Sequence, residues 1–159
     1  MMKSKQSLDD RDMKILEILQ RDGRITKSEL AAQVNLSPAP CWERLKKLED
    51  QGYITGFSAD VDIRKIAPVT EVLVQVTLSN HRTQDFKQFE DKIDDMPQVT
   101  NCWSISGGAD YMLRLIVADI HAYQDLMETL LESQIGIEKY FGYVVVKETK
   151  SSPPPLKHS

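Results

Sequence analysis

Residues 26–48 carry the pattern of two short helices separated by a tight break. Thr26 is followed three positions later by Glu29, which is the capping-box spacing that starts a helix. The break runs from Asn35 to Ser37, and a serine followed by proline is typical of the N-cap and first residue of a second helix. Two short helices joined in this way predict a helix-turn-helix, whose second helix enters the major groove of DNA.

Another helix precedes this pair. Leu8 and Asp9 are expected to act as hydrophobic staple and N-cap, and Gly23 is expected to end the element. The chain therefore begins with a three-helix unit. Beyond the third helix, Gly52 to Phe57 is a β-prone run, either a small wing or the start of a connector.

The last of the three helices separates into two faces on a helical wheel. Cys41, Leu45 and Leu48 fall together and are expected in the core. The opposite face is basic, and its Lys46 and Lys47 are the best placed to reach DNA phosphates. The pattern therefore predicts a DNA-contacting surface on the outer side of this helix.

Three other side chains of this helix have two interpretations each. Arg44 lies about 60° from the core stripe, so it either contacts DNA or lies along apolar surface and pairs with an acid. Glu43 either accepts a hydrogen bond from a cytosine amino group or pairs with Lys47. Trp42 either stacks on sugar-phosphate or fills the join between the first and third helices. The candidate DNA-contacting residues are Thr26, Lys27, Ser37, Ala39, Pro40, Trp42, Glu43, Arg44, Lys46 and Lys47.

The net charge decides how such a surface can hold DNA. The chain of 159 residues has 20 Lys and Arg against 24 Asp and Glu, which gives a formal net charge of −4. The positive charge is therefore local to one helix face. A single copy would neutralise few phosphates, so useful affinity requires several copies on one DNA. This predicts an oligomer.

The hydrophobic period changes from helical to alternating in the second half of the chain. Val72, Val74, Val76 and Leu78 alternate with other side chains, which predicts a half-buried strand. The order of elements, β-α-β-β-α-β, is that of a ferredoxin-like domain, so the predicted fold class is α+β. Further strands are expected at 99–106, 111–117 and 140–146, with helices beginning near Thr83 and Asp119.

A four-stranded sheet with both helices on one face leaves its other face bare. Leu73 and Gln75 belong to that face, together with either Trp103 or Cys102, depending on the register of the second strand. A second copy of the chain is the simplest cover. The sequence therefore predicts a homodimer.

The segment from Ser106 to Tyr111 has two interpretations. It is either a β-hairpin turn, in which glycines supply positive φ and Asp110 accepts a turn hydrogen bond, or a ligand site. As a ligand site, the backbone N–H groups of Gly107 and Gly108 would hold a carboxylate. Asp110 would pair with an ammonium group, and Tyr111 would wall the pocket and donate its hydroxyl. This combination suits a zwitterionic amino acid.

Two stretches together resemble one family. The run from Leu36 to Phe57, LSPAPCWERLKKLEDQGYITGF, resembles the recognition helix and exit of the Lrp/AsnC (feast/famine) family of transcription regulators. The later run SGGADYML, from Ser106, resembles that family's ligand-loop signature G-x-x-D-Y. The resemblance covers about residues 8–150. It implies a regulator that binds double-stranded DNA, forms dimers that assemble to tetramers or octamers, and senses an amino acid or related small metabolite.

The resemblance also implies where the effector binds. In the family the loop lies at a contact between dimers, and the end of the last helix and the last strand are expected to contribute from the other side. Gly142 stands where the family often has a hydroxyl residue, so ligand selectivity is expected to differ. The candidate effector-binding residues are Ser106, Gly107, Gly108, Asp110, Tyr111, Gln134 and Tyr140.

Several classes of function lack the residues they require. No apolar stretch approaches the ~18–20 residues of a membrane span, and the histidines and cysteines lack metal-ligand spacing. No nucleophile elbow or phosphate loop occurs. Cys41 and Cys102 are expected to be reduced thiols in a cytoplasm. We therefore expect a cytoplasmic protein that is not an enzyme, with no metal, no cofactor and no membrane partner.

The expected organisation has four parts. These are a helix-turn-helix domain at 1–58, a connector at 59–68, a ferredoxin-like effector-binding and oligomerisation domain at 69–150, and a Pro-rich disordered tail at 151–159. The alternative function is a small-molecule-binding regulatory or architectural assembly module whose helical half contacts protein.

Overall fold

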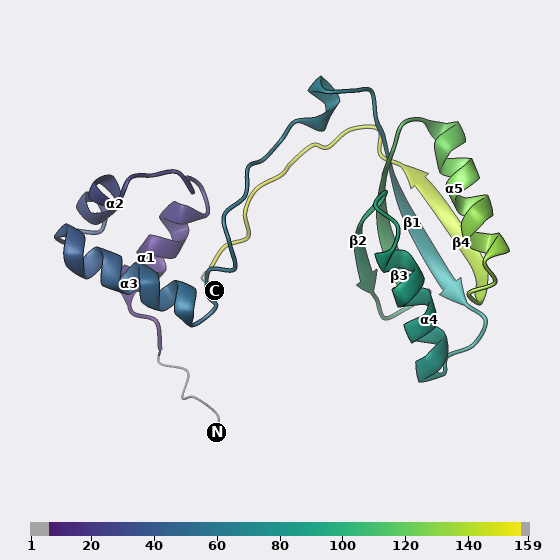
Figure 1. The fold of residues 1–159 in the computed structure, drawn as a ribbon, viewed down its shortest axis with the longest axis horizontal. Helices are drawn as coiled ribbons and strands as arrows, with labels where there is room; N and C mark the ends of the chain where they lie inside the picture. The colour runs from purple at the N-terminus through teal and green to yellow at the C-terminus, as the bar shows by residue number, and fades with distance from the viewer. Residues whose placement is uncertain (1–6, 157–159) are drawn as a thin grey trace. The chain divides into compact units, whose positions relative to one another are not determined.

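The computed structural model describes residues 7–156, and the chain folds into two compact units (Figure 1). Of the described residues, the first unit, the helical domain, contains 7–60 and 150–156. The second, the sheet domain, runs from Val61 to Thr149. The expected connector at 59–68 is thus divided between the two units, and it holds one turn of 3-10 helix at Ile63–Lys65.

The helical domain contains α1 (Asp10–Leu19), α2 (Lys27–Gln33) and α3 (Pro38–Asp50). Capping boxes start α1 and α2, with Asp9 and Thr26 as the N-caps. The predicted three-helix unit is therefore confirmed, and its core is apolar. The buried members of that core are Ile15, Leu30, Ala31, Val34, Cys41, Leu45 and Leu48.

The break between α2 and α3 is a Schellman motif. Asn35 takes the left-handed conformation, with a φ of 54°. The Leu36 N–H donates to the Ala31 carbonyl at 2.9 Å, and the Asn35 N–H donates to the Ala32 carbonyl at 3.2 Å. Asparagine is one of the few residues other than glycine that visits this conformation readily. This local chemistry ends α2 and turns the chain into α3.

The segment after α3 packs on the helical core. Gly52, with a φ of 75°, ends α3, and the Tyr53 N–H donates to the Leu48 carbonyl at 2.9 Å. Tyr53 and Ile54 then contact the core. Between positions 51 and 69, all of which the structure describes, no residue lies in a β-strand. Of the two expectations for this run, the small wing is therefore wrong.

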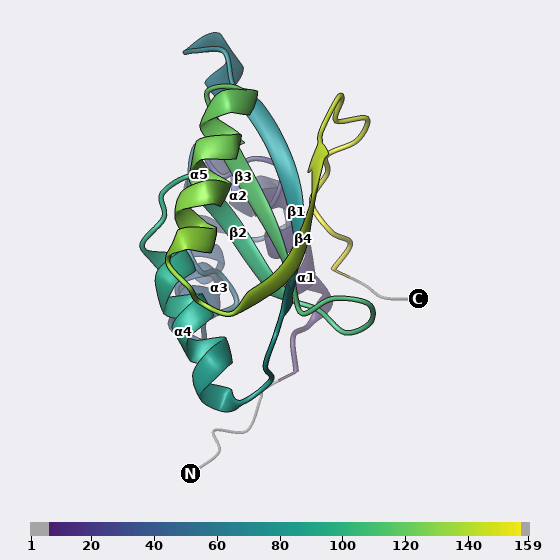
Figure 2. The same ribbon diagram turned by 90° about the vertical axis from the view of Figure 1, so that its right-hand side faces the viewer.

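The sheet domain has the predicted β-α-β-β-α-β order. Its strands form one antiparallel sheet in the order β2-β3-β1-β4. Figure 2 shows α4 and α5 together on one side of that sheet. The elements are β1 (Thr70–Leu78), α4 (Thr83–Asp94), β2 (Val99–Ser104), β3 (Tyr111–Val117), α5 (Ile120–Glu132) and β4 (Ile137–Val144).

The core of the sheet domain lies between the sheet and its two helices. Alternate residues of β1 and β3 are buried there, as the period of the sequence predicts. Phe89 and Ile93 of α4 and Met127 and Leu130 of α5 close over them. The opposite face of the sheet carries no helix, which confirms the expectation of a bare face in the single chain (Figure 2).

Two strands have other bounds than expected, since β2 ends earlier and β4 begins earlier. β2 stops at Ser104 because the Ile105 N–H donates to the Asp110 carbonyl and begins the loop. β4 starts earlier, because Gly136 takes a φ of 82° and directs Ile137 into pairing with Leu78.

The C-terminal segment, for which the sequence predicts a disordered or extended chain, groups with the helical domain. Residues 150–156 form no helix or strand, but they belong to the helical domain and contact it. The remaining tail residues, 157–159, lie outside the described part of the chain. Within residues 7–156, no helix is long and apolar enough to cross a membrane.

Candidate functional site

The outer face of α3 offers side chains that the protein itself does not use. Ala39, Glu43, Lys46 and Lys47 are all exposed. Within residues 7–156 neither lysine forms an ion pair, so the pairing of Glu43 with Lys47 that was one alternative is not formed. Two ammonium groups on one helix face, both free of internal partners, form a surface suited to phosphate.

The N-terminus of α3 depends on side chains for any contact it makes. Ser37 is the N-cap by position, but its hydroxyl makes no capping hydrogen bond. Pro38 and Pro40 have no N–H, so the first turn has fewer backbone donors than an ordinary helix start. The exposed Ser37 hydroxyl is thus available to a phosphate, whereas backbone anion binding is weakened here.

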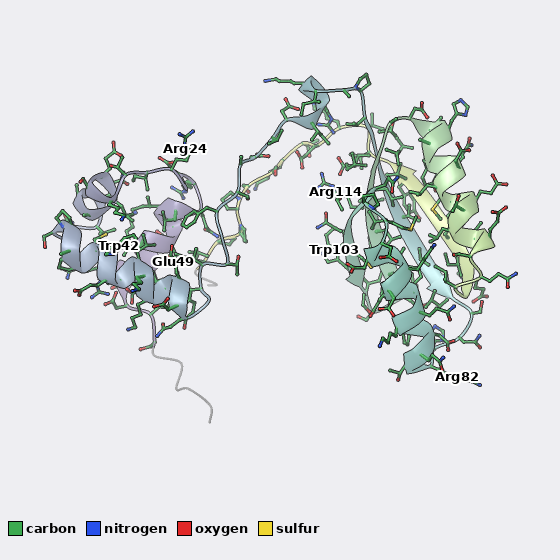
Figure 3. The ribbon with its side chains drawn as sticks, in the orientation of Figure 1. Arg24, Trp42, Glu49, Arg82, Trp103 and Arg114 are labelled. Carbon is green, nitrogen blue, oxygen red and sulfur yellow. The ribbon has the colours of Figure 1, made fainter. Side chains whose placement is uncertain are left out.

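Trp42 does not fill the join between α1 and α3. Its side chain, labelled in Figure 3, is 41% exposed. The Lys27 ammonium from α2 lies 3.3 Å from the centre of the Trp42 ring. This cation–π contact joins the starts of α2 and α3 on the surface. It excludes the plug interpretation and keeps Lys27 and Trp42 together as one basic and aromatic patch.

Arg44 forms ion pairs with two carboxylates of the same chain. Its guanidinium donates to Asp9 at 2.6 Å and to Asp12 at 2.8 Å, which ties α3 to the start of α1. The two carboxylates raise the pKa of Arg44, while the Asp12 N–H and the guanidinium lower the pKa of Asp9. Of the two interpretations of Arg44, the structure therefore shows pairing with acids.

Thr26 is likewise engaged within the chain. Its hydroxyl donates to the Glu29 carboxylate at 2.6 Å and accepts from the Glu29 N–H at 3.2 Å. The bonds that the Glu29 carboxylate accepts from the Thr26 hydroxyl and from the Thr26 N–H lower the pKa of Glu29. A contact from Thr26 to DNA would compete with the capping box that starts α2.

The loop between β2 and β3 is built around Asp110. Its carboxylate accepts from the Leu78 N–H at 2.7 Å and from His81 at 3.2 Å. Its backbone also bonds on both sides, since its N–H donates to the Val76 carbonyl and its carbonyl accepts from Ile105. Asp110 therefore holds the loop to the end of β1, and an incoming ammonium group would share or replace these partners.

Tyr111 is buried directly after the loop and lines, with Glu90 and Cys102, a cavity of about 340 Å³ beside α4 and β2. Its side chain is 2% exposed, its ring packs against Phe89 of α4, and its hydroxyl donates to Glu90 at 2.7 Å. Burial and then the bond to Glu90 raise the pKa of Tyr111 well above its usual range. In the single chain the Tyr111 hydroxyl already donates to Glu90, and the role of Tyr111 as the wall of a ligand pocket stays a prediction.

The second group of candidate effector residues lies at the same end of the sheet. The Ser79 N–H and hydroxyl both bond to the Gly136 carbonyl, at 2.8 and 3.2 Å. Gln134, with a φ of 52°, is exposed in this turn. Tyr140 pairs with Val76 in the ladder and is half-buried. The end of β1 therefore joins the Asp110 loop on one side to the Gln134 turn on the other.

The glycines of the loop face open space. Gly107 has a φ of 132°, and a Cβ at Gly107 or Gly108 would meet no atom within 4 Å. Ser106 beside them is also exposed. His81 and Glu90 complete the surroundings of this loop, and neither is among the residues that the sequence predicts for the effector site. Both are brought in by tertiary pairing, for which neighbouring residues give no signal.

The bare face of the sheet is aromatic, and its register is now defined. Trp103 pairs with Met112, Met112 with Gln75, and Gln75 with Phe141. Trp103 is therefore the residue of this face, and Cys102 pairs with the core residue Leu113 instead. The large side chains exposed here are Trp103, Phe141 and Tyr143.

An ion pair crosses the same face. Arg114 of β3 donates to Glu71 of β1 at 2.6 Å, and Arg64 lies 3.6 Å from the same carboxylate. Arg114 and Trp103 come from neighbouring strands (Figure 3). The two arginines thus balance the negative charge of the Glu71 carboxylate, which a second copy covering this face would bury.

Two family descriptions match the two domains. Residues 8–55 match the winged helix-turn-helix DNA-binding family, and residues 71–155 match the Lrp/AsnC ligand binding domain. A helix-turn-helix followed by a ligand-binding domain defines a DNA-binding transcription regulator, and not an enzyme. The chain belongs to the Lrp/AsnC family.

Individual relatives agree over nearly the whole chain. The transcriptional regulatory protein DoeX of Halomonas elongata is 46% identical over 143 residues, which cover 90% of each chain. The leucine-responsive regulatory protein of Escherichia coli K12 is 39% identical over 146 residues, covering 91% of this chain and 88% of that one. A transcriptional regulator of Neisseria meningitidis, solved in complex with L-Met, superposes with a TM-score of 0.86 at 31% identity, covering 92% and 94% of the two chains.

Proposed function

We propose that this regulator changes its DNA affinity in response to an amino acid or a closely related metabolite. The observation that carries the proposal is the Asp110 loop within a matched Lrp/AsnC ligand-binding domain. Its relatives include one regulator named for leucine and one solved with L-Met. A DNA-binding regulator of this kind works in the cytoplasm.

The DNA contacts divide into two kinds. Lys46, Lys47 and the Ser37 hydroxyl serve the phosphates and fix position on the duplex. Ala39 and Glu43, exposed between them, are placed to contact base edges, where a methyl group favours thymine and a carboxylate favours cytosine. The outer-face residues thus combine affinity with sequence preference.

A second group borders this face. The Lys27–Trp42 pair and Pro40 lie beside it and contact the backbone next to the major groove.

The effector site is formed by the loop around Asp110, which is bonded to the end of β1. The ligand carboxylate is held by the open backbone at Gly107 and Gly108. Its ammonium group replaces His81 at the Asp110 carboxylate, while the bond from Leu78 stays. Tyr111, buried directly after the loop, supports it.

Gln134 and Tyr140, two of the remaining candidate residues, lie on the other side of the end of β1. Gln134 and Tyr140 serve the ligand side chain, and Ser106 serves its polar groups. Gly142 is covered by the ring of Tyr123, whose Cζ lies 2.8 Å from where a Cβ would stand. Position 142 therefore offers no side chain to a ligand.

Assembly connects the two sites. The aromatic bare face pairs two chains, which places two recognition helices on half-sites about 34 Å apart, one turn of DNA. Further assembly to tetramers or octamers brings Asp110 loops to contacts between dimers. A ligand bound there shifts assembly, and through it DNA affinity, by its differential affinity for the two oligomeric states.

The experiment has two measurements on the purified full chain. The first is anisotropy of a labelled 40-bp duplex across a salt series, which should show tight binding that weakens steeply with salt. The second is a thermal-shift panel over the amino acids and their catabolites, in which one or a few compounds should raise the melting temperature. No duplex binding at low salt would exclude the DNA-binding role, and a flat panel would exclude the sensor role.

A further inference from the structure

The helical domain carries an apolar groove away from its DNA-facing side. The cavity is about 340 Å³ and lies between α1 and the segment that follows α3. No residue of α3 lines it, so the groove is separate from the recognition helix. Its apolar lining includes Leu8, Leu16, Leu19, Tyr53, Ile54 and Phe57.

The C-terminal segment of the same chain lies along this groove and forms part of its wall. Leu156 is partly buried and lines the cavity. Two residues before it, the Pro154 carbonyl accepts a hydrogen bond of 3.4 Å from the Gln20 side chain on α1. Residues 150–156 accordingly group with the helical domain.

The chemistry of the segment matches the groove. Three consecutive prolines, Pro153 to Pro155, restrict φ and favour an extended polyproline II conformation that loses little entropy on docking. Prolines also lack N–H groups, so they can lie on apolar surface without leaving a donor unpaired. Aromatic-lined grooves suit such segments, and Tyr53 and Phe57 supply the rings here.

We propose that this groove is a docking site for a proline-rich segment ending in an aliphatic side chain, and that its occupant is the chain's own tail, residues 150–156. The chain leaves the helical domain after Asp60 and returns at Lys150, a few residues after β4 ends at Val144. The docked tail, which is covalently joined to the sheet domain and held non-covalently on the helical domain, therefore gives the two domains a second connection.

The second connection restricts how freely the helical domain moves. This step rests on the proposed DNA-binding function. In an assembled protein, two helical domains that sample fewer orientations meet two half-sites at a higher effective concentration. Tail docking should strengthen binding to a duplex that engages two helical domains and should leave binding to a single half-site unchanged.

The first test measures the docking itself. A labelled peptide with the sequence KSSPPPLKHS is titrated into a chain that ends at Thr149. We expect saturable binding, which is lost with the matched peptide carrying serine in place of leucine. The Phe57→Ala variant of the truncated chain should also lose it, because Phe57 is 54% exposed and is not required for the helical core. A peptide that does not bind the truncated chain would overturn the docking site.

The second test compares duplexes of two lengths for the full chain, Leu156→Ser, and the chain ending at Thr149. Ser151→Ala is the matched control in the tail. All should bind a 12-bp duplex equally, whereas Leu156→Ser and the truncated chain should bind a 40-bp duplex about three- to tenfold more weakly. Sedimentation should show the same oligomeric state for each.

Three results would count against the restraint. They are equal binding to both duplexes by every variant, equal loss on both duplexes, and a changed oligomeric state. If the full chain binds no duplex, the proposed function fails, and the peptide titration still decides the docking site.

Discussion

The outer face of α3 and the loop around Asp110 are both expected binding surfaces, and they differ in how much of their chemistry is free. Lys46 and Lys47 form no ion pair among the described residues. Asp110, in contrast, already holds Leu78 and His81. One helical domain by itself therefore presents these two lysines of its expected DNA-facing surface unpaired. In the effector loop of one chain, the Asp110 carboxylate already has partners within the chain.

This difference has a physical origin. Side chains on the outer face of a helix point away from the core, and the backbone of α3 satisfies itself. A loop at the end of a sheet must instead bond its own backbone to neighbouring strands, and Asp110 supplies those bonds. A ligand there competes with internal partners, so its binding is readily coupled to a rearrangement or to a neighbouring chain.

Assembly gives the largest expected effect, because it acts on both surfaces. Phe141→Glu adds a charge to the aromatic bare face, where Phe141 is 52% exposed in the single chain. Burying that unpaired charge against a second copy costs about 3 kcal/mol or more, so the dimer should weaken at least about 100-fold. Sedimentation measures the dimer, and anisotropy on a 40-bp duplex should show a parallel loss.

The control for this substitution is Gln124→Glu on exposed α5, which adds the same charge on the helix side of the sheet. It should leave the dimer intact. A dimer of normal strength in Phe141→Glu would move the interface to another surface.

The effector loop gives the next effect. Asp110→Ala leaves the Leu78 N–H without its acceptor, which should lower the free energy of unfolding by about 1–3 kcal/mol. The variant should still bind DNA without ligand but lose the thermal shift that the wild type shows with its amino acid. His81→Ala is the matched partner. It should keep or strengthen the response, because the ligand ammonium replaces His81. An unchanged response in Asp110→Ala would make the loop a simple turn.

The sequence predicts the helical surface better than the effector loop, for reasons that particular residues show. Cys41, Leu45 and Leu48 repeat with the helical period, so the buried and outer faces of α3 are correct. The choice between Trp103 and Cys102 depends on a register shift between Val99 and Asn101, which alternation alone does not reveal.

Tyr111 and the pair of His81 with Asp110 illustrate two further limits. Tyr111 is in phase with Leu113 and Leu115 on β3, so the period of the strand by itself indicates that the Tyr111 side chain is buried. The pairing of His81 with Asp110 joins residues 29 positions apart. No local pattern in the sequence predicts it.

The lysines of α3 give a smaller effect, confined to DNA. Lys46→Ala with Lys47→Ala should lower the slope of log affinity against log salt by about 1.8, at about 0.9 for each lost phosphate contact. Affinity near 0.1 M salt should fall by up to about 60-fold for every sequence tested. Lys14→Ala on α1, which removes a lysine that already pairs with Glu17, should change neither quantity. An unchanged slope in the double variant would place the DNA surface elsewhere.

Substitution of Arg44 should have the smallest effect on DNA binding. It distinguishes the side chains of α3 that are free to contact DNA from the one that is already paired within the chain. Arg44→Ala removes the partner of Asp12, whose side chain is 12% exposed, and should lower the free energy of unfolding by about 1 kcal/mol after allowing for solvent around the pair. Because the folded state lowers the pKa of Asp9 below its ordinary value of 3.8, the related stabilisation is present above that pH and is lost as the pH falls through the lowered pKa. Urea unfolding between pH 2 and 7 should therefore show a shallower acid limb in Arg44→Ala.

The salt dependence of DNA binding by Arg44→Ala should stay as in the wild type, since the guanidinium is already engaged. A slope lower by about 0.9 would mean that Arg44 leaves the two carboxylates to contact a phosphate, and the division between free and engaged side chains on α3 would not hold.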